Sequence, residues 1–246
     1  MLIGEEGVGR LKNSRVAVFG VGGVGGFCVE ALARSGVGSL DLIDNDTICE
    51  SNLNRQIIAV RKTIGMAKVD AAEERIHDID PDITVTKYRC FYLPENAGLF
   101  DFSVYDYVVD ALDTVTAKID IAMRAHEAGV PVISAMGAGN KMDPTRFYVT
   151  DLFDTKMDPL AKVLRRELRK RGIEHLKVVC SDEPAMTPLF SPAEEETDPE
   201  NETAALPKAP RKRAVPGSIA FVPSAAGLII AGEVIRDLVN NGSDGT

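Results

Sequence analysis

The 246-residue sequence has no run of 18 uncharged apolar residues, the length that a membrane-spanning helix requires. Its most apolar stretch, residues 218–234, contains Pro223 and Glu233, and we interpret it as buried. The N-terminus has no basic segment followed by an apolar block, so we expect no signal peptide. We therefore expect a cytoplasmic protein with no membrane partner.

Cysteine is scarce, and its four occurrences (Cys28, Cys49, Cys90 and Cys180) lie far apart without a C-x-x-C pair. Structural zinc sites normally take two ligands from such a pair, so we expect no zinc. A disulfide framework is also not expected in a reducing compartment.

Net positive charge is also absent. The formal charge of −9 argues against a protein that coats nucleic acid with its whole surface. The charges are nevertheless segregated along the chain. Residues 162–177 hold seven Lys or Arg against two Glu, residues 182–202 hold eight acids and no base, and a basic run at 208–213 follows.

Short apolar segments alternate with helical patterns, which predicts an α/β, Rossmann-like fold with a mostly parallel sheet and helices on both faces. We expect residues 1–181 to form one such domain and the proline-rich residues 182–216 to be a mobile crossover segment. Residues 217–246 should return to the same domain as a strand (218–221) and a helix (224–239). The other expected strands are 15–19, 40–43, 83–88, 107–109 and 130–135, and the other expected helices are 23–35, 66–79, 116–128 and 158–171.

A glycine-rich turn follows the first predicted strand and opens a helix, with glycines at Gly20, Gly22, Gly23 and Gly25. Glycines here permit a tight turn and let backbone amides approach phosphate at the helix N-terminus. The pattern alone fits NAD as well as ATP.

Two acids stand at the end of the second predicted strand. Asp44, 24 residues after Gly20, is placed to accept hydrogen bonds from ribose hydroxyls in either nucleotide. Asp46 has two interpretations, as a nucleotide-binding residue or as a residue that caps the loop.

Polar residues that suit a triphosphate come after the later strands. They are Asn52, Arg55 and Gln56, then Lys68 on a helix, then Asp113 in an Asp-x-x-Asp sequence. A triphosphate needs cations against its oxygens and a carboxylate to hold Mg²⁺, whereas hydride transfer needs neither. The residues therefore favour ATP with Mg²⁺, with Arg55, Lys68 and Asp113 as the catalytic candidates.

Taken together, these residues resemble the superfamily of ubiquitin-activating enzymes and the bacterial adenylyltransferases of molybdopterin and thiamine biosynthesis. The match covers about residues 10–180. The resemblance implies that Asp44 binds ribose, that Asn52, Arg55 and Lys68 contact the phosphates, and that Asp113 holds Mg²⁺.

Within this superfamily, the zinc-binding adenylyltransferases carry two C-x-x-C pairs and a catalytic cysteine in the crossover segment. Residues 182–216 contain no cysteine, and Cys180 just before them is more readily an inert strand cysteine than a thioester nucleophile. Three motifs are instead similar to the tRNA threonylcarbamoyladenosine dehydratase family: Arg61-x-x-Ile-Gly65, residues 136–144, and Asp158-Pro-Leu160.

That family uses ATP to cyclise the threonylcarbamoyl group on an adenosine beside the tRNA anticodon, and its members are homodimers. The resemblance implies that the substrate carboxylate attacks the α-phosphate of ATP and that a second group of the same substrate then expels AMP. No thiol is required. Relatives carry an N-terminal arm with an arginine that reaches the nucleotide; whether Arg10 takes that role stays open.

Three other functions stay open at this point. The first is adenylation of the C-terminus of a ubiquitin-like sulfur carrier, with sulfur-transfer or redox partner proteins. The second is a non-catalytic subunit that keeps the fold, against which the presence of Arg55, Lys68 and Asp113 argues. The third is an NAD oxidoreductase.

A basic stripe supports an RNA substrate. On a helix, one face carries Leu160, Val163, Leu164 and Leu168, and the other carries Lys162, Arg165, Arg166, Arg169 and Lys170. Such a stripe is either a solvated face or a contact to a phosphate backbone. In a chain of charge −9 we favour the tRNA contact, which residues 211–213 would extend.

Overall fold

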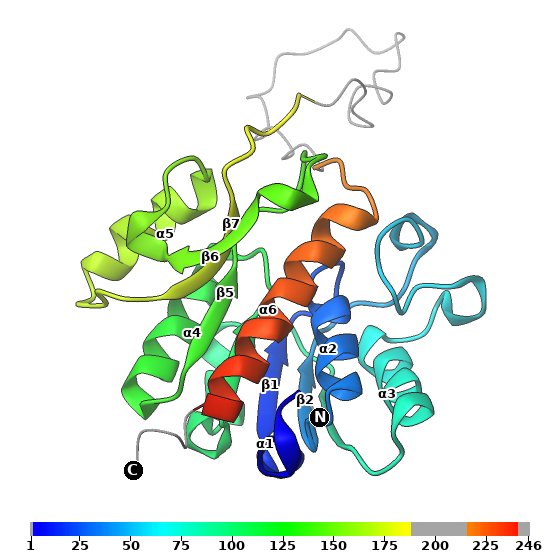
Figure 1. Cartoon of the computed structure of the whole chain (residues 1–246). Helices are drawn as coiled ribbons and strands as arrows, with labels where there is room; N and C mark the ends of the chain where they lie inside the picture. The colour runs from blue at the N-terminus through cyan, green and yellow to red at the C-terminus, as the bar shows by residue number, and fades with distance from the viewer. Residues whose placement is uncertain (1, 188–215, 241–246) are drawn as a thin grey trace, which may run out of the picture.

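The computed structural model describes residues 2–187 and 216–240. They form a seven-stranded sheet with the order β3-β2-β1-β4-β5-β7-β6 (Figure 1). Six strands run parallel, and β6 pairs antiparallel with β7 at one edge. The strands are β1 (Arg15–Phe19), β2 (Ser39–Ile43), β3 (Thr84–Tyr88), β4 (Tyr107–Asp110), β5 (Val132–Ala135), β6 (Phe147–Asp151) and β7 (Lys177–Ser181). The prediction of a mostly parallel α/β sheet is confirmed.

Helices cover both faces of the sheet because its central strands are apolar on both sides. In β1, Val16 and Val18 pack into the core beneath α2, α3 and α6, whereas Ala17 and Phe19 pack against α4 on the other face. Figure 1 shows α6 lying alongside α2 over the first of these faces. The helices are α1 (Gly4–Asn13), α2 (Gly25–Arg34), α3 (Lys68–Ile79), α4 (Val115–Ala128), α5 (Pro159–Arg169) and α6 (Phe221–Asn240).

Local sequence signals set the ends of the helices near the site. The α4 helix ends where Gly129 adopts a left-handed conformation with φ of 68°, which favours glycine. The α5 helix begins at Pro159, and the carboxylate of Asp158 accepts a hydrogen bond from the Ala161 amide at 3.0 Å.

The predicted strand at residues 218–221 is wrong. The backbone of Gly217 exchanges hydrogen bonds with Asn140, and the Ser218 carbonyl accepts one from the side chain of Asn54, so no sheet ladder forms. The α6 helix starts at Phe221, and Pro223 fits its first turn because the missing amide has no helical partner there. The prediction also missed α1 and β6, whereas the interpretation of Cys180 as a strand residue is confirmed by β7.

The crossover lies largely outside the described residues. Our expectations that residues 182–216 are mobile and that residues 211–213 extend the basic stripe fall on positions 188–215, which the structure does not describe. Within the two described ranges, no helix is long and apolar enough to cross a membrane.

Candidate active site

A cavity of about 430 Å³ opens at the carboxyl ends of β1, β2 and β4. The strand order reverses between β1 and β4, and parallel α/β sheets bind ligands at such a switch point. The cavity is lined by residues from all the predicted motifs: Gly20, Gly22, Gly23, Asp44, Asp46, Asn52, Arg55, Gln56, Lys68 and Asp113.

The glycine turn is shaped by two contacts that leave no room for a side chain. Gly20 has a φ of 92°, and a Cβ there would lie 2.8 Å from the Ala111 carbonyl oxygen. A Cβ on Gly25 would lie 1.8 Å from the Gly20 carbonyl oxygen. Gly25 does not line the cavity; it lets α2 approach the end of β1, while Gly22 and Gly23 face the cavity.

Asp44 ties the second strand to the glycine turn. Its carboxylate accepts hydrogen bonds from the Val21 amide at 2.8 Å and from the Asp46 amide at 2.9 Å. Lys68 is buried, and its Nζ lies 2.6 Å from Asp46 and 3.7 Å from Asp44. Asp46 therefore pairs with the lysine, and it is Asp44 that holds the loop through the Asp46 amide.

The next group comes from a short 3-10 turn (Glu50–Asn52) and the residues after it. Asn52 is buried and accepts a hydrogen bond from the Cys49 amide at 3.1 Å. Arg55 donates to the Ser51 carbonyl at 2.8 Å and to the side chain of Asn54 at 2.9 Å. Asn52 and Arg55 both line the cavity, so these contacts hold one amide and one guanidinium at its wall.

Gln56 carries a group that fits a ligand. Across the described ranges, its Oε1 is the single buried side-chain oxygen or nitrogen without a hydrogen-bond partner. A buried acceptor left unpaired costs about 1–3 kcal/mol.

Asp113 lies exposed at the cavity edge, at the end of a loop that a buried network holds in place. At the loop's start, Asp110 accepts hydrogen bonds from the Leu112 amide at 3.2 Å, from Ser134 Oγ at 2.6 Å and from Lys118 Nζ at 3.1 Å. Asp110 and Lys118 are both about 1% exposed. No local pattern of residues indicates that Lys118 is buried.

A magnesium ion would fit this site only together with phosphate. No three His, Cys, Asp or Glu side chains of residues 2–187 and 216–240 gather to hold a metal. Mg²⁺ commonly uses one or two carboxylates and completes its shell with substrate phosphates and water. The lone carboxylate of Asp113 suits that arrangement.

Sequence reasoning missed several residues of the cavity wall. Cys90, Phe91 and Tyr92 follow β3, so the rule that ligands bind at strand ends would have found them. Pro216, Ser218 and Pro223 also line the cavity, but they come from the far end of the chain and no local pattern marks them.

Two residues of uncertain role lie away from the cavity lining. Cys180 is buried in β7, and burial raises the pKa of its thiol, which keeps it protonated at neutral pH. Arg10 on α1 donates to the Val239 carbonyl and pairs with Glu6. Arg10 therefore anchors α1 to the end of α6.

The five cations of α5 differ in their surroundings. Arg165 donates to the Thr155 carbonyl at 2.7 Å, and the guanidinium of Arg169 lies over the Phe153 ring at 5.3 Å from its centroid. Arg169 is nevertheless exposed, as are Lys162, Arg166 and Lys170, the last of which follows the final residue of α5. Glu167 pairs with Arg166 and Lys170, which lowers the local positive charge.

Comparison with known proteins identifies the family. The model of the ThiF family matches residues 1–245. A Bacillus subtilis tRNA threonylcarbamoyladenosine dehydratase is 45% identical over 98% of this chain and 93% of its own length. The Escherichia coli protein of the same name is 40% identical over 68% of this chain, an alignment that spans 63% of that protein, just under two thirds.

Solved structures agree with these matches. The crystal structure of the Escherichia coli tRNA N6-threonylcarbamoyladenosine dehydratase in complex with AMP superposes with a TM-score of 0.85 at 30% identity, covering 99% of this chain and 93% of that one. The complex of the same enzyme with ATP also has a TM-score of 0.85 at 30% identity, and it covers 100% of this chain and 93% of that one. The chain therefore belongs to the ThiF family and, within it, to the group of the tRNA threonylcarbamoyladenosine dehydratases.

Proposed function

We propose that this protein is an ATP-dependent enzyme that cyclises the threonylcarbamoyl group on an adenosine beside a tRNA anticodon. The observation that carries the proposal is the single cavity in which the glycine turn, Asp44, Arg55, Lys68 and Asp113 meet. The similar Escherichia coli enzyme has been crystallised with ATP and with AMP, the substrate and a product of such a reaction.

The proposed reaction has two steps, and ATP is a substrate that the reaction consumes. In the first, an oxygen of the substrate carboxylate attacks the α-phosphorus, and the bond to pyrophosphate breaks. In the second, a nitrogen or oxygen of the same threonylcarbamoyl group attacks the activated carbonyl carbon, loses its proton, and AMP leaves with the former carboxylate oxygen. Because this step is intramolecular, correct positioning supplies much of its rate.

The residues of the cavity have distinct tasks in this proposal. Arg55 is held at the cavity wall by a backbone carbonyl and Asn54, and its guanidinium would pair with phosphate oxygens. Lys68 would exchange its contact with Asp46 for the phosphates. Asp113 would hold Mg²⁺, which neutralises charge on the phosphates when bound. Asp44 would accept hydrogen bonds from the ribose hydroxyls.

We assign tRNA binding to the exposed face of α5. The Asp158 carboxylate at its start also accepts a hydrogen bond from the Gly137 amide at 2.9 Å, and Ala138 and Gly139 next to it line the cavity. The start of the helix therefore stands beside the nucleotide cavity. Lys162, Arg166, Arg169 and Lys170 are exposed and would meet the phosphates, Arg166 and Lys170 by giving up their pairing with Glu167. Arg165 is held by its hydrogen bond to Thr155.

We also propose a homodimer, from the family resemblance, together with a cytoplasmic location and a requirement for Mg²⁺. Light scattering after gel filtration tests the first. Titration of activity with EDTA and then with Mg²⁺ tests the third. Sulfur-transfer or redox partners would be sought by co-purification.

The direct test is to incubate the purified protein with ATP, Mg²⁺ and tRNA that carries threonylcarbamoyladenosine. Mass spectrometry of the digested nucleosides should show loss of one water from the modified nucleoside, with AMP and pyrophosphate formed in equal amounts. NAD in place of ATP should give no conversion and a smaller thermal shift. Conversion of a sulfur-carrier protein ending in Gly-Gly, without conversion of tRNA, would overturn the proposal.

A further inference from the structure

A second cavity of about 280 Å³ adjoins the nucleotide cavity. Three short segments line it: residues 140–142, which follow β5, residues 186–187, and residues 217–219, which precede α6. Ser218 lines both cavities, so the two meet at this residue.

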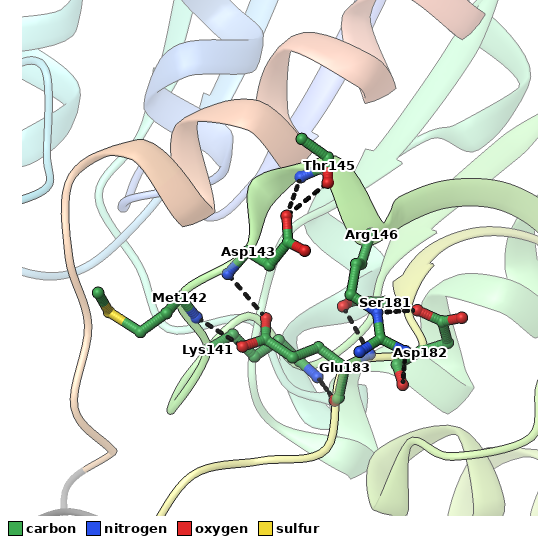
Figure 2. Close-up of polar contacts among 8 residues, drawn as sticks. All are labelled: Lys141, Met142, Asp143, Thr145, Arg146, Ser181, Asp182 and Glu183. Carbon is green, nitrogen blue, oxygen red and sulfur yellow. Dashed lines mark hydrogen bonds and ion pairs between the residues drawn. The ribbon is translucent and has the colours of Figure 1, made fainter.

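The first wall of this second cavity is fixed by a polar cluster. Figure 2 shows the Glu183 carboxylate turned toward the backbone of the facing loop, where it accepts hydrogen bonds from the Met142 amide at 2.9 Å and the Asp143 amide at 3.0 Å. Lys141 Nζ donates to the Glu183 carbonyl at 2.5 Å, and Arg146 pairs with Asp182 at 2.7 Å. These contacts fix residues 141–146 against residues 182–183.

Asn140 joins all three walls. It has a φ of 57°, the one non-glycine residue of the described ranges in the left-handed region. Its amide donates to the Gly217 carbonyl at 2.7 Å, its Oδ1 accepts from the Gly217 amide at 2.6 Å, and its carbonyl accepts from the Met186 amide at 2.8 Å. Because its left-handed backbone is strained, Asn140 keeps this conformation only where surrounding contacts hold it. Its three hydrogen bonds fix the position of the three segments relative to one another.

The chemistry of the walls differs from that of the nucleotide cavity. Two thioether side chains stand at the second cavity, Met142 with 49% and Met186 with 53% of its surface exposed. Lys141, the one charged side chain of this lining, is buried and bonded to a carbonyl. Thioethers pack well on flat aromatic groups, and the volume is near the lower end of about 300–1,000 Å³ for small-molecule pockets. A nucleobase fits such a site better than a phosphate does.

We propose that this second cavity takes the adenine base that bears the threonylcarbamoyl group. That group would then extend past Ser218, with its carboxylate directed at the α-phosphate of ATP. The inference rests on the proposed function and deepens it, because it assigns the acceptor a place of its own beside the nucleotide.

The kinetic test is the double variant Met142→Ala/Met186→Ala. Loss of both thioether contacts should raise the KM for modified tRNA about tenfold, because apolar area no longer covers the base. The KM for ATP should not change. The salt dependence of tRNA binding should also be unchanged, because no phosphate contact is lost. Met157→Ala is the matched control, since that methionine is 58% exposed and lines neither cavity.

A second measurement does not depend on turnover. Peroxide oxidation of Met142 and Met186, followed by peptide mass spectrometry, should be slowed several-fold by an anticodon stem-loop that carries threonylcarbamoyladenosine. A stem-loop with plain adenosine should protect the two methionines less at the same concentration. It lacks the threonylcarbamoyl group and should therefore bind more weakly. Met157 should react equally in every sample.

The outcomes separate the two hypotheses. If the parent converts tRNA but the double variant has an unchanged KM and the two stem-loops protect equally, the inference is wrong and the proposed function stands. If both methionines resist oxidation without RNA, the chain itself fills the cavity and the inference is again wrong. If the parent converts no modified tRNA, the proposed function fails first.

Discussion

Replacing Lys118 with methionine should destabilise the protein strongly, although the substitution preserves much of the side-chain volume. Lys118 Nζ contacts Asp110 Oδ2 at 3.1 Å, Ser134 Oγ at 3.1 Å and the Ala135 carbonyl at 2.8 Å. All of this lies in the interior, and methionine would leave the Asp110 carboxylate without a countercharge. Breaking a buried ion pair by removing one partner costs about 3–5 kcal/mol.

The structure places the expected loss at the lower end of this range. Asp110 would keep two hydrogen bonds, from Ser134 Oγ at 2.6 Å and from the Leu112 amide at 3.2 Å, which still stabilise its charge. We therefore expect a loss of about 3 kcal/mol in the free energy of unfolding. For a chain of this length that corresponds to a decrease of about 6–12 °C in Tm.

Urea unfolding followed by circular dichroism would measure the loss, with the slope of the transition checked for constancy. Lys87→Met is the matched control, because Lys87 pairs with Asp70 and Glu73 at the surface and should cost about 1 kcal/mol or less. The double variant Lys118→Met/Asp110→Asn removes both charges and should recover part of the stability. A loss in Lys118→Met no larger than in Lys87→Met would refute the reasoning.

Three further predictions concern the site and its surroundings. Asp113→Asn and Arg55→Ala should each abolish adenylate formation with an unchanged Tm, and near-parental ATP–pyrophosphate exchange in either variant would remove that residue from the catalytic set. Cys180→Ala should retain turnover, because cyclisation needs no thiol; loss of activity in a folded variant would revive a thioester mechanism. Hydrogen bonds from Arg171, Lys170 and Arg166 lower the pKa of Glu167 from 4.5 to about 2, so its ionised form stabilises the fold above pH 4.5 and loses that effect as pH falls toward 2. The difference in Tm between the parent and Glu167→Gln should therefore shrink over that interval, and a constant difference would contradict the pairing.

Much of the candidate site could be predicted from the sequence because its motifs obey a local rule. The glycine turn, Asp44 and the Asp-x-x-Asp sequence each follow directly on a predicted strand. The carboxyl ends of parallel strands meet at one edge of a sheet, so residues far apart in the chain converge there. The alternation of short apolar strands with helices was likewise sufficient for the parallel order of the central sheet.

Other features depended on partners that no local pattern reveals. Residues 218–221 are apolar enough to predict a strand, yet Asn140 and Asn54 take up the backbone groups of Gly217 and Ser218, so the segment closes the cavity instead. The antiparallel edge strand β6 was missed as well.

The sequence by itself determined the fold class, the nucleotide motifs and the family, since each follows from residue types at short spacing. Only the tertiary structure decided what each cation of the basic stripe contacts. Arg165 and Arg169 look equivalent to Arg166 along the helix, but Thr155 and Phe153 lie against the first two. The burial of Lys118 and the second cavity beside Ser218 were decided in the same way. Each of these features depends on contacts between segments that only folding brings together. Those contacts determine whether a charged side chain stabilises the interior or remains at the surface.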